Sequence, residues 1–85
     1  MPKSRTRNAD AARFGAILRR LREQRGWTKA KLATRAGMNA IYLGYVEEGR
    51  NAPTISTVLE LLEVLGVDAG EVMRELAEAR RATPP

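Results

Sequence analysis

The residues best equipped for chemistry in this 85-residue sequence are its cations. Residues 1–37 carry eleven Lys or Arg against Asp10 and Glu23, a formal balance of +9. Residues 38–85 carry four Arg against eight acidic residues, a balance of −4. This asymmetry is typical of a surface that faces a polyanion such as nucleic acid and is backed by an acidic rear. The alternative is that the basic helices are simply solvated.

Cysteine and histidine are both absent. Their absence removes disulfides, ordinary zinc sites, thiol nucleophiles and the commonest general base. We therefore expect a protein that is not an enzyme, with no cofactor and no metal, and we find no nucleophile, base or metal set that would support a hydrolase. Charges interrupt every apolar stretch, and the N-terminus lacks the apolar segment of a signal peptide. We expect a cytoplasmic protein, of bacterial cytoplasm or nucleoid, with no membrane contact.

The length allows one hydrophobic core and one domain. We expect a flexible basic arm at residues 1–7, an all-α domain at 8–80 and a tail at 81–85. The tail is expected because the final prolines cannot continue a helix.

Apolar periodicity predicts a first helix that begins near Asn8 or Asp10 and runs to Arg25, where Gly26 ends it. The periodic positions are Phe14, Ile17, Leu18 and Leu21.

Two short helices follow. Thr28 is placed to cap a helix at 29–35, and Asn39 to cap another at 40–48. Gly37 lies in the bend between them, where a positive φ is needed. Small Ala33 lets two steeply crossing helices approach closely, so residues 28–48 have the pattern of a helix-turn-helix.

The last two helices are predicted from their caps and apolar stripes. Thr54 caps the fourth helix, which ends at Gly66 and is expected to be mostly core. Its apolar stripe comprises Ile55, Val58, Leu59, Leu62 and Leu65. Asp68 and Glu71 have the spacing of a capping box for a fifth helix, which is expected to fade after Ala79.

Together these features resemble the lambda-repressor-like (Cro/C1, XRE-type) family of helix-turn-helix DNA-binding domains, a five-helix fold, over about Phe14 to Leu76. The shared features are the five helices, the turn glycine, Glu47-x-Gly49, Pro53-Thr54 and Leu65-Gly66-Val67. The resemblance implies that the third helix lies in the DNA major groove and the second across the phosphate backbone.

By this resemblance, the candidate base contacts are Asn39, Ala40, Ile41 and Tyr45. Only Asn39 and Tyr45 could form hydrogen bonds to bases, whereas Ala40 and Ile41 suit thymine methyl groups. Part of the specificity is then expected from DNA shape. The alternative is that Ile41 and Tyr45 pack into protein, either the core or a partner.

The candidate phosphate contacts are Lys29, at the first turn of the second helix, with Tyr42, Arg50, Arg5 and Arg7. Lys29 could instead be a solvated lysine, and the basic arm a solubilising tail. Glu48 is unfavourable near phosphate and is expected to point away or pair with Arg50.

The resemblance also implies a structural ion pair between Arg22 and Glu47 that joins the first and third helices. The alternative is a surface arginine of little energetic weight. Trp27 precedes the Thr28 cap and is interpreted as a core residue.

A short reading helix covers few base pairs, so a homodimer on a palindromic operator of double-stranded DNA is expected, with half-sites about 34 Å apart. The candidate dimer surface is Val67, Val72, Met73 and Leu76. The alternative is that these side chains complete the monomer core, and then the dimer contact lies elsewhere. The expected function is sequence-specific transcriptional regulation. The alternative function is a protein-interaction module or antitoxin whose apolar third helix contacts a protein partner.

Overall fold

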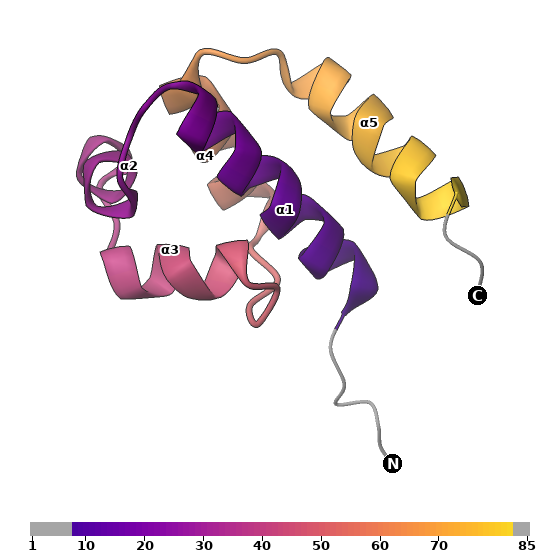
Figure 1. Cartoon of the computed structure of the whole chain (residues 1–85), viewed down its shortest axis with the longest axis horizontal. Coiled ribbons are helices and arrows are strands. Elements are labelled where there is room, and N and C mark those ends of the chain that lie inside the picture. The colour runs from indigo at the N-terminus through magenta and orange to yellow at the C-terminus, as the bar shows by residue number, and fades with distance from the viewer. Residues whose placement is uncertain (1–7, 83–85) are drawn as a thin grey trace.

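The computed structural model describes residues 8–82, and these form five helices with no strand among them (Figure 1). The helices are α1 (Ala9–Gln24), α2 (Lys29–Ala36), α3 (Ala40–Glu47), α4 (Ile55–Leu65) and α5 (Ala69–Ala82). The predicted all-α architecture is therefore confirmed. The arm expected at residues 1–7 and the last part of the tail, residues 83–85, lie outside the described residues.

Side-chain caps, predicted from the sequence for the last four helices, fix where the helices begin. The side chains of Asn8, Thr28, Asn39 and Thr54 each accept hydrogen bonds from backbone N–H groups in the first turn of α1 to α4. These bonds satisfy donors that the helix itself leaves without partners. Asp68 does the same for α5, where Glu71 N donates to its carboxylate at 2.9 Å.

The C-terminal end of α5 differs from the prediction. The helix continues to Ala82 instead of fading after Ala79. Arg80 and Arg81 are good helix formers whose charge suits the C-terminal end of a helix. Arg80 also reaches Asp10 of α1, with its Nε 3.6 Å from the carboxylate.

One hydrophobic core joins the helices. Its fully buried side chains are Leu18, Leu32, Leu43, Val46, Leu61, Leu62 and Leu65. The expectation that the α4 stripe is mostly core is wrong at two positions, because Ile55 is 65% exposed and Leu59 is 49% exposed. The core takes the side of α4 that carries Val58, Leu61 and Leu62, and this leaves Ile55 and Leu59 on its outer side.

The backbone of α1 lies against the end of α3. A Cβ atom at Gly15 would lie 2.5 Å from the carbonyl oxygen of Glu47 and closer still to that of Val46. Gly49, at φ +78°, lies against Ala12 in the same way, with 2.8 Å between a would-be Cβ and Ala12 Cα. Two glycines thus allow α1 to fix the position of α3.

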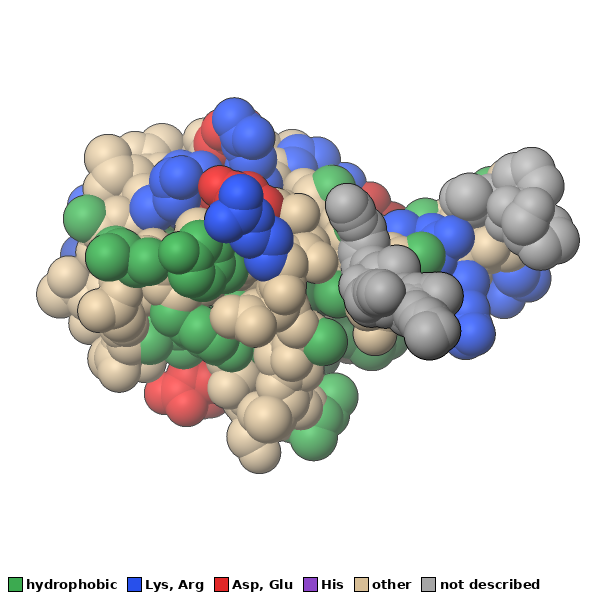
Figure 2. Space-filling view, turned by 90° about the horizontal axis from the view of Figure 1, so that it is seen from below, with side chains coloured by type: hydrophobic (Ala, Val, Ile, Leu, Met, Phe, Trp, Pro, Cys, Tyr) green, Lys and Arg blue, Asp and Glu red, His purple; other side chains and the backbone are tan. Residues whose placement is uncertain are grey.

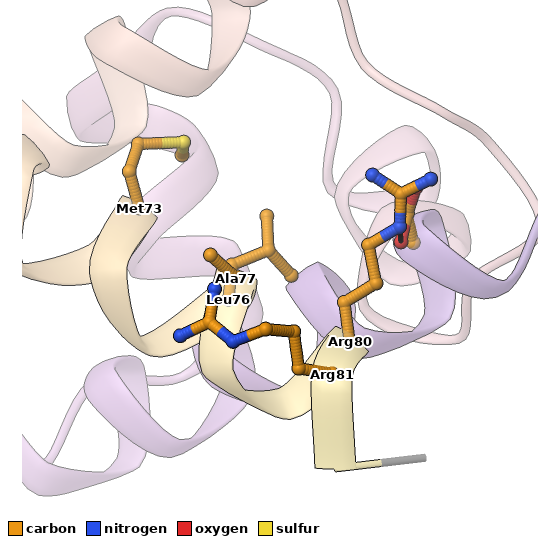
Figure 3. Close-up of a pocket in the computed structure, with 6 residues that line it drawn as sticks. Met73, Leu76, Ala77, Arg80 and Arg81 are labelled. Atoms are coloured by element: carbon orange, nitrogen blue, oxygen red, sulfur yellow. Dashed lines mark ion pairs between the residues drawn. The ribbon is translucent and has the colours of Figure 1, made fainter. Parts of the chain in front are cut away.

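Polar contacts and a few apolar side chains attach α5 to α1. Both guanidinium Nη atoms of Arg20 donate to the carboxylate of Glu75, which lowers the pKa of Glu75 below its ordinary value. A hollow of about 580 Å³ remains beside this attachment, and in Figure 3 Met73, Leu76 and Arg80 lie along it.

Candidate nucleic-acid interface

The outer face of α3 is apolar and open. Ile41 is 67% exposed and Tyr45 40%, one helical turn apart, while Leu43 and Val46 on the inner side are fully buried. The interpretation that Ile41 and Tyr45 belong to the monomer core is therefore wrong. Ala40, Ile41, Gly44 and Tyr45 line a shallow hollow of about 320 Å³ with Lys29 and Glu48. Figure 2 views the molecule from the side on which α3 lies in Figure 1, and it shows apolar side chains next to Lys and Arg side chains.

Lys29 supplies a positive charge at this hollow. Its Cδ and Nζ lie 3.9 Å from where a Cβ of Gly44 would be, so the lysine stem runs across the bare backbone of α3. Within residues 8–82 no ion pair involves Lys29. The charge is therefore available to an anion at the N-terminal end of α2, where the helix dipole adds to it.

Arg50, Glu48 and Tyr45 form a group at the other end of α3. The Arg50 Nε lies 3.2 Å from the Glu48 carboxylate, so the expected pairing of Glu48 with Arg50 is confirmed. The guanidinium carbon of Arg50 also lies 5.3 Å from the centre of the Tyr45 ring. Glu48 thus offsets part of the Arg50 charge, and Arg50 steadies the ring of Tyr45.

Asn39 and Tyr42 are less free than the sequence indicates. The side-chain oxygen of Asn39 accepts hydrogen bonds from the backbone N–H of Ile41 at 2.7 Å and of Tyr42 at 3.3 Å. Asn39 is exposed, so its side-chain NH₂ group is accessible as a hydrogen-bond donor to a ligand. Tyr42 is half-buried and packs against the core.

Arg22 and Glu47 come together as the resemblance implies. The Arg22 Nε lies 2.6 Å and the Nη2 3.0 Å from the two oxygens of Glu47, and Nη1 donates to the Trp27 carbonyl at 2.7 Å. Both side chains are buried, and the hydrogen bonds that Arg22 donates to Glu47 raise the pKa of Arg22 above its ordinary value. This pair joins α1 to the end of α3 and so holds the exposed face of α3 at a fixed angle.

The structure separates the other predicted residues. Arg5 and Arg7 lie outside the described residues. The predicted dimer surface needs correction, since Val72 is buried in the core, and Val67 and Leu76 are half-buried against it. Of that set only Met73 is exposed, at 36%. The core needs Val67, Val72 and Leu76 to attach α5 and the preceding loop. Among residues 8–82, the large apolar side chains exposed outside α3 are Ile55 and Leu59 of α4 and Met73 of α5.

Sequence reasoning missed a group of cations around Trp27. The guanidinium carbons of Arg25 and Arg35 and the Nζ of Lys31 lie 4.7, 5.0 and 5.5 Å from the centre of its ring. The available signal was the spacing, because Trp27, Lys31 and Arg35 are successively four residues apart. Trp27 itself packs against the core, as predicted.

Among residues 8–82, no helix is long and apolar enough to span a membrane. Over the same residues, no cluster of three or more acidic side chains is arranged to hold a metal ion.

The chain is similar in sequence to known helix-turn-helix proteins. The helix-turn-helix domain family matches residues 13–77. An uncharacterised HTH-type transcriptional regulator of Mycobacterium bovis is 40% identical over 65 residues, which cover 76% of this chain and 25% of that protein. The chain thus spans about a quarter of the length of this relative.

Solved structures share the fold. The restriction-modification controller protein C.AhdI of Aeromonas hydrophila is 32% identical, with a TM-score of 0.73 over 76% of this chain and 98% of that one. The controller protein C.Esp1396I, solved as a tetramer with its 35-base-pair operator, is 17% identical. Its TM-score is 0.76 over 84% of this chain and 93% of that one, a likeness of fold alone.

Proposed function

The chain belongs to the helix-turn-helix domain family, and from this premise we propose that it is a sequence-specific DNA-binding transcriptional regulator that catalyses no reaction. The observation that carries the proposal is the exposed face of α3, with Lys29 at its edge in no ion pair with the described residues 8–82. In this reading α3 enters the major groove, while Lys29 and the N-terminal end of α2 hold a phosphate. A bacterial cytoplasm or nucleoid is the corresponding location.

The side chains of α3 and its N-cap have different roles in recognition. Ile41 and Ala40 pack on thymine methyl groups, and Tyr45 and the Asn39 amide donate hydrogen bonds to base edges. Tyr42 and Arg50 contact the backbone at the two edges of the helix, joined by Arg5 and Arg7 of the arm. Such a face has few bidentate contacts, so part of the specificity comes from DNA shape.

We also propose that two copies bind a palindromic site. Helix α3 has only eight residues and spans about 12 Å, so one copy reads few base pairs. A two-fold dimer doubles the site, with half-sites about 34 Å apart. The apolar side chains available for the contact are Ile55 and Leu59 of α4, together with Met73 of α5.

Duplex binding followed by fluorescence anisotropy tests this function. Affinity should fall steeply with salt, by ~10³ to 10⁵ between about 50 and 200 mM if roughly six to ten phosphates are contacted. Lys29→Ala should weaken binding to all duplexes alike, whereas Tyr45→Ala should change the sequences recovered from a random pool. Arg74→Ala on exposed α5 is the control matched in charge and should change neither. Equal effects of Lys29→Ala and Arg74→Ala would contradict the assignment of α2 and α3.

A second function is favoured by one observation, the absence of charge on the most exposed part of α3. In that case α3 would bind a protein partner. Weak DNA binding at both salt concentrations would support this reading over the first.

A further inference from the structure

Three cations surround the chain's single tryptophan. Arg25 from the loop before α2, and Lys31 and Arg35 from α2 itself, lie within 5.5 Å of the Trp27 ring centre. We call Arg25, Trp27, Lys31 and Arg35 the Trp27 cluster. Trp27 is half-buried and anchored to the core, so the cluster has a rigid base.

The charges of the Trp27 cluster are not neutralised. Within residues 8–82 no ion pair involves Arg25, Lys31 or Arg35, and α2 contains no acidic residue. Like charges held around one ring repel each other, and an exposed cation–π contact offsets only part of this repulsion. A guanidinium whose face rests on an indole still has its N–H edge free for an anion. The cluster therefore favours a ligand that carries several negative charges.

The Trp27 cluster lies away from the face that α3 presents. Lys29 and Ala33 are one turn apart on α2, and this edge adjoins α3, since Ala33 is buried and Lys29 crosses Gly44. Lys31 and Arg35 are also one turn apart, but they lie about 200° further round the helix. A duplex held against α3 and Lys29 therefore leaves this side of α2 open.

We propose that the Trp27 cluster docks an acidic segment of a partner protein, and that it does so independently of DNA on α3. Carboxylates match the free edges of Arg25 and Arg35, which can bind them in bidentate fashion. The one-turn spacing of Lys31 and Arg35 suits a segment whose acidic residues recur at a similar interval of about 5 to 6 Å.

A fluorescein-labelled hexaglutamate peptide is the probe, with hexaglutamine as the uncharged control. Anisotropy should show saturable binding of hexaglutamate to the full chain, and the emission of Trp27 should change as it binds. The variant Arg25→Gln, Lys31→Gln, Arg35→Gln should bind at least about ten-fold more weakly, or about 1.4 kcal/mol. The matched variant Arg19→Gln, Arg74→Gln, Arg81→Gln has the same formal charge and should bind within about two-fold of wild type.

Several results would overturn the proposal. One is equal weakening by the two triple variants, since the peptide would then report net charge alone. Another is a larger loss of duplex affinity in the Trp27-cluster variant than in the charge-matched variant at Arg19, Arg74 and Arg81, which would make the cluster a phosphate contact. Circular dichroism checks that each variant is folded. The double variant Lys31→Gln, Arg35→Gln is milder and should still weaken hexaglutamate binding by several-fold. If wild type binds hexaglutamate through the cluster but binds no duplex, the DNA-binding function fails and this inference stands.

Discussion

Arg22 connects three parts of the chain through one side chain. It extends from α1, holds Glu47 at the end of α3 with two hydrogen bonds, and donates a third to the Trp27 carbonyl before α2. Only 8% of the Arg22 side chain and 4% of the Glu47 side chain are exposed. Arg22 also lies 3.9 Å from the carboxylate of Glu23, whereas within residues 8–82 the ion pairs of Glu47 involve Arg22 alone. Loss of Arg22 therefore leaves the buried Glu47 carboxylate without its cation.

Arg22→Ala should therefore destabilise the fold. We expect the free energy of unfolding to fall by about 3 to 5 kcal/mol, measured by urea denaturation followed by circular dichroism. Arg19→Ala removes an exposed pair with Glu23 on the same helix and should cost less than about 1 kcal/mol.

Replacing both partners distinguishes charge from packing. Arg22→Met with Glu47→Leu fills the same space without ions and should recover most of the lost stability. A loss below about 1 kcal/mol in Arg22→Ala would instead mean that the pair holds α3 only weakly.

The crossing of α1 and α3 depends on backbone contact. At Gly15 the carbonyls of Val46 and Glu47 occupy the place of a Cβ, and neither can move without shifting the end of α3. Gly44 in α3 is different, because the atoms facing it belong to the flexible Lys29 side chain at 3.9 Å. Gly15 and Gly44 therefore have opposite tolerance for a methyl group.

Gly15→Ala and Gly44→Ala should change stability in opposite directions. Alanine stabilises a helix by about 1 kcal/mol relative to glycine. Gly44→Ala has no opposing clash, so its melting temperature should rise. In Gly15→Ala the methyl group forces α1 from α3, which outweighs that gain and should lower stability by about 1 to 3 kcal/mol. A Gly15→Ala protein as stable as wild type would contradict the close approach.

The helices were predictable and their contacts less so. Asn8, Thr28, Asn39 and Thr54 mark helix starts because capping is a local interaction. The close approach at Gly15 depends on a residue some thirty positions away, and the period of α4 does not tell which edge of its stripe the core will cover. For this reason the sequence predicts Ile55 and Leu59 in the core and Val72 on the dimer surface, whereas the structure exposes the first two and buries Val72.

In the candidate site, too, some features are predictable from the sequence and others are not. The helix-turn-helix pattern predicts that Ile41 and Tyr45 are exposed, but periodicity alone leaves open that they pack into the core, and the structure decides for exposure. The pairing of Arg50 with Tyr45 and the cations around Trp27 depend on side-chain conformations, which periodicity does not specify.

Besides the Trp27 cluster, the molecule as a whole presents two separate surfaces. The α3 face, with Lys29 at its edge, is suited to a duplex, and the outer side of α4 carries the exposed apolar pair Ile55 and Leu59. Exposed apolar side chains grouped on a small domain often mark an interface. A dimer built through α4 leaves both copies of α3 free, which reading two half-sites requires.

Ile55→Gln with Leu59→Gln should therefore convert a dimer to a monomer without changing the net charge. Sedimentation equilibrium should show the mass fall by half, and affinity for a duplex with two half-sites should fall by about ten-fold or more, because the second copy no longer binds from an effectively high local concentration. Affinity for a single half-site should stay unchanged.

Ile41→Gln is the matched control, since Ile41 is as exposed as Ile55 but lies on α3. Ile41→Gln should weaken duplex binding and leave the mass unaltered. If Ile41→Gln halves the mass and the α4 variant does not, the dimer contact lies on α3. That result would contradict the role of α3 as the reading helix.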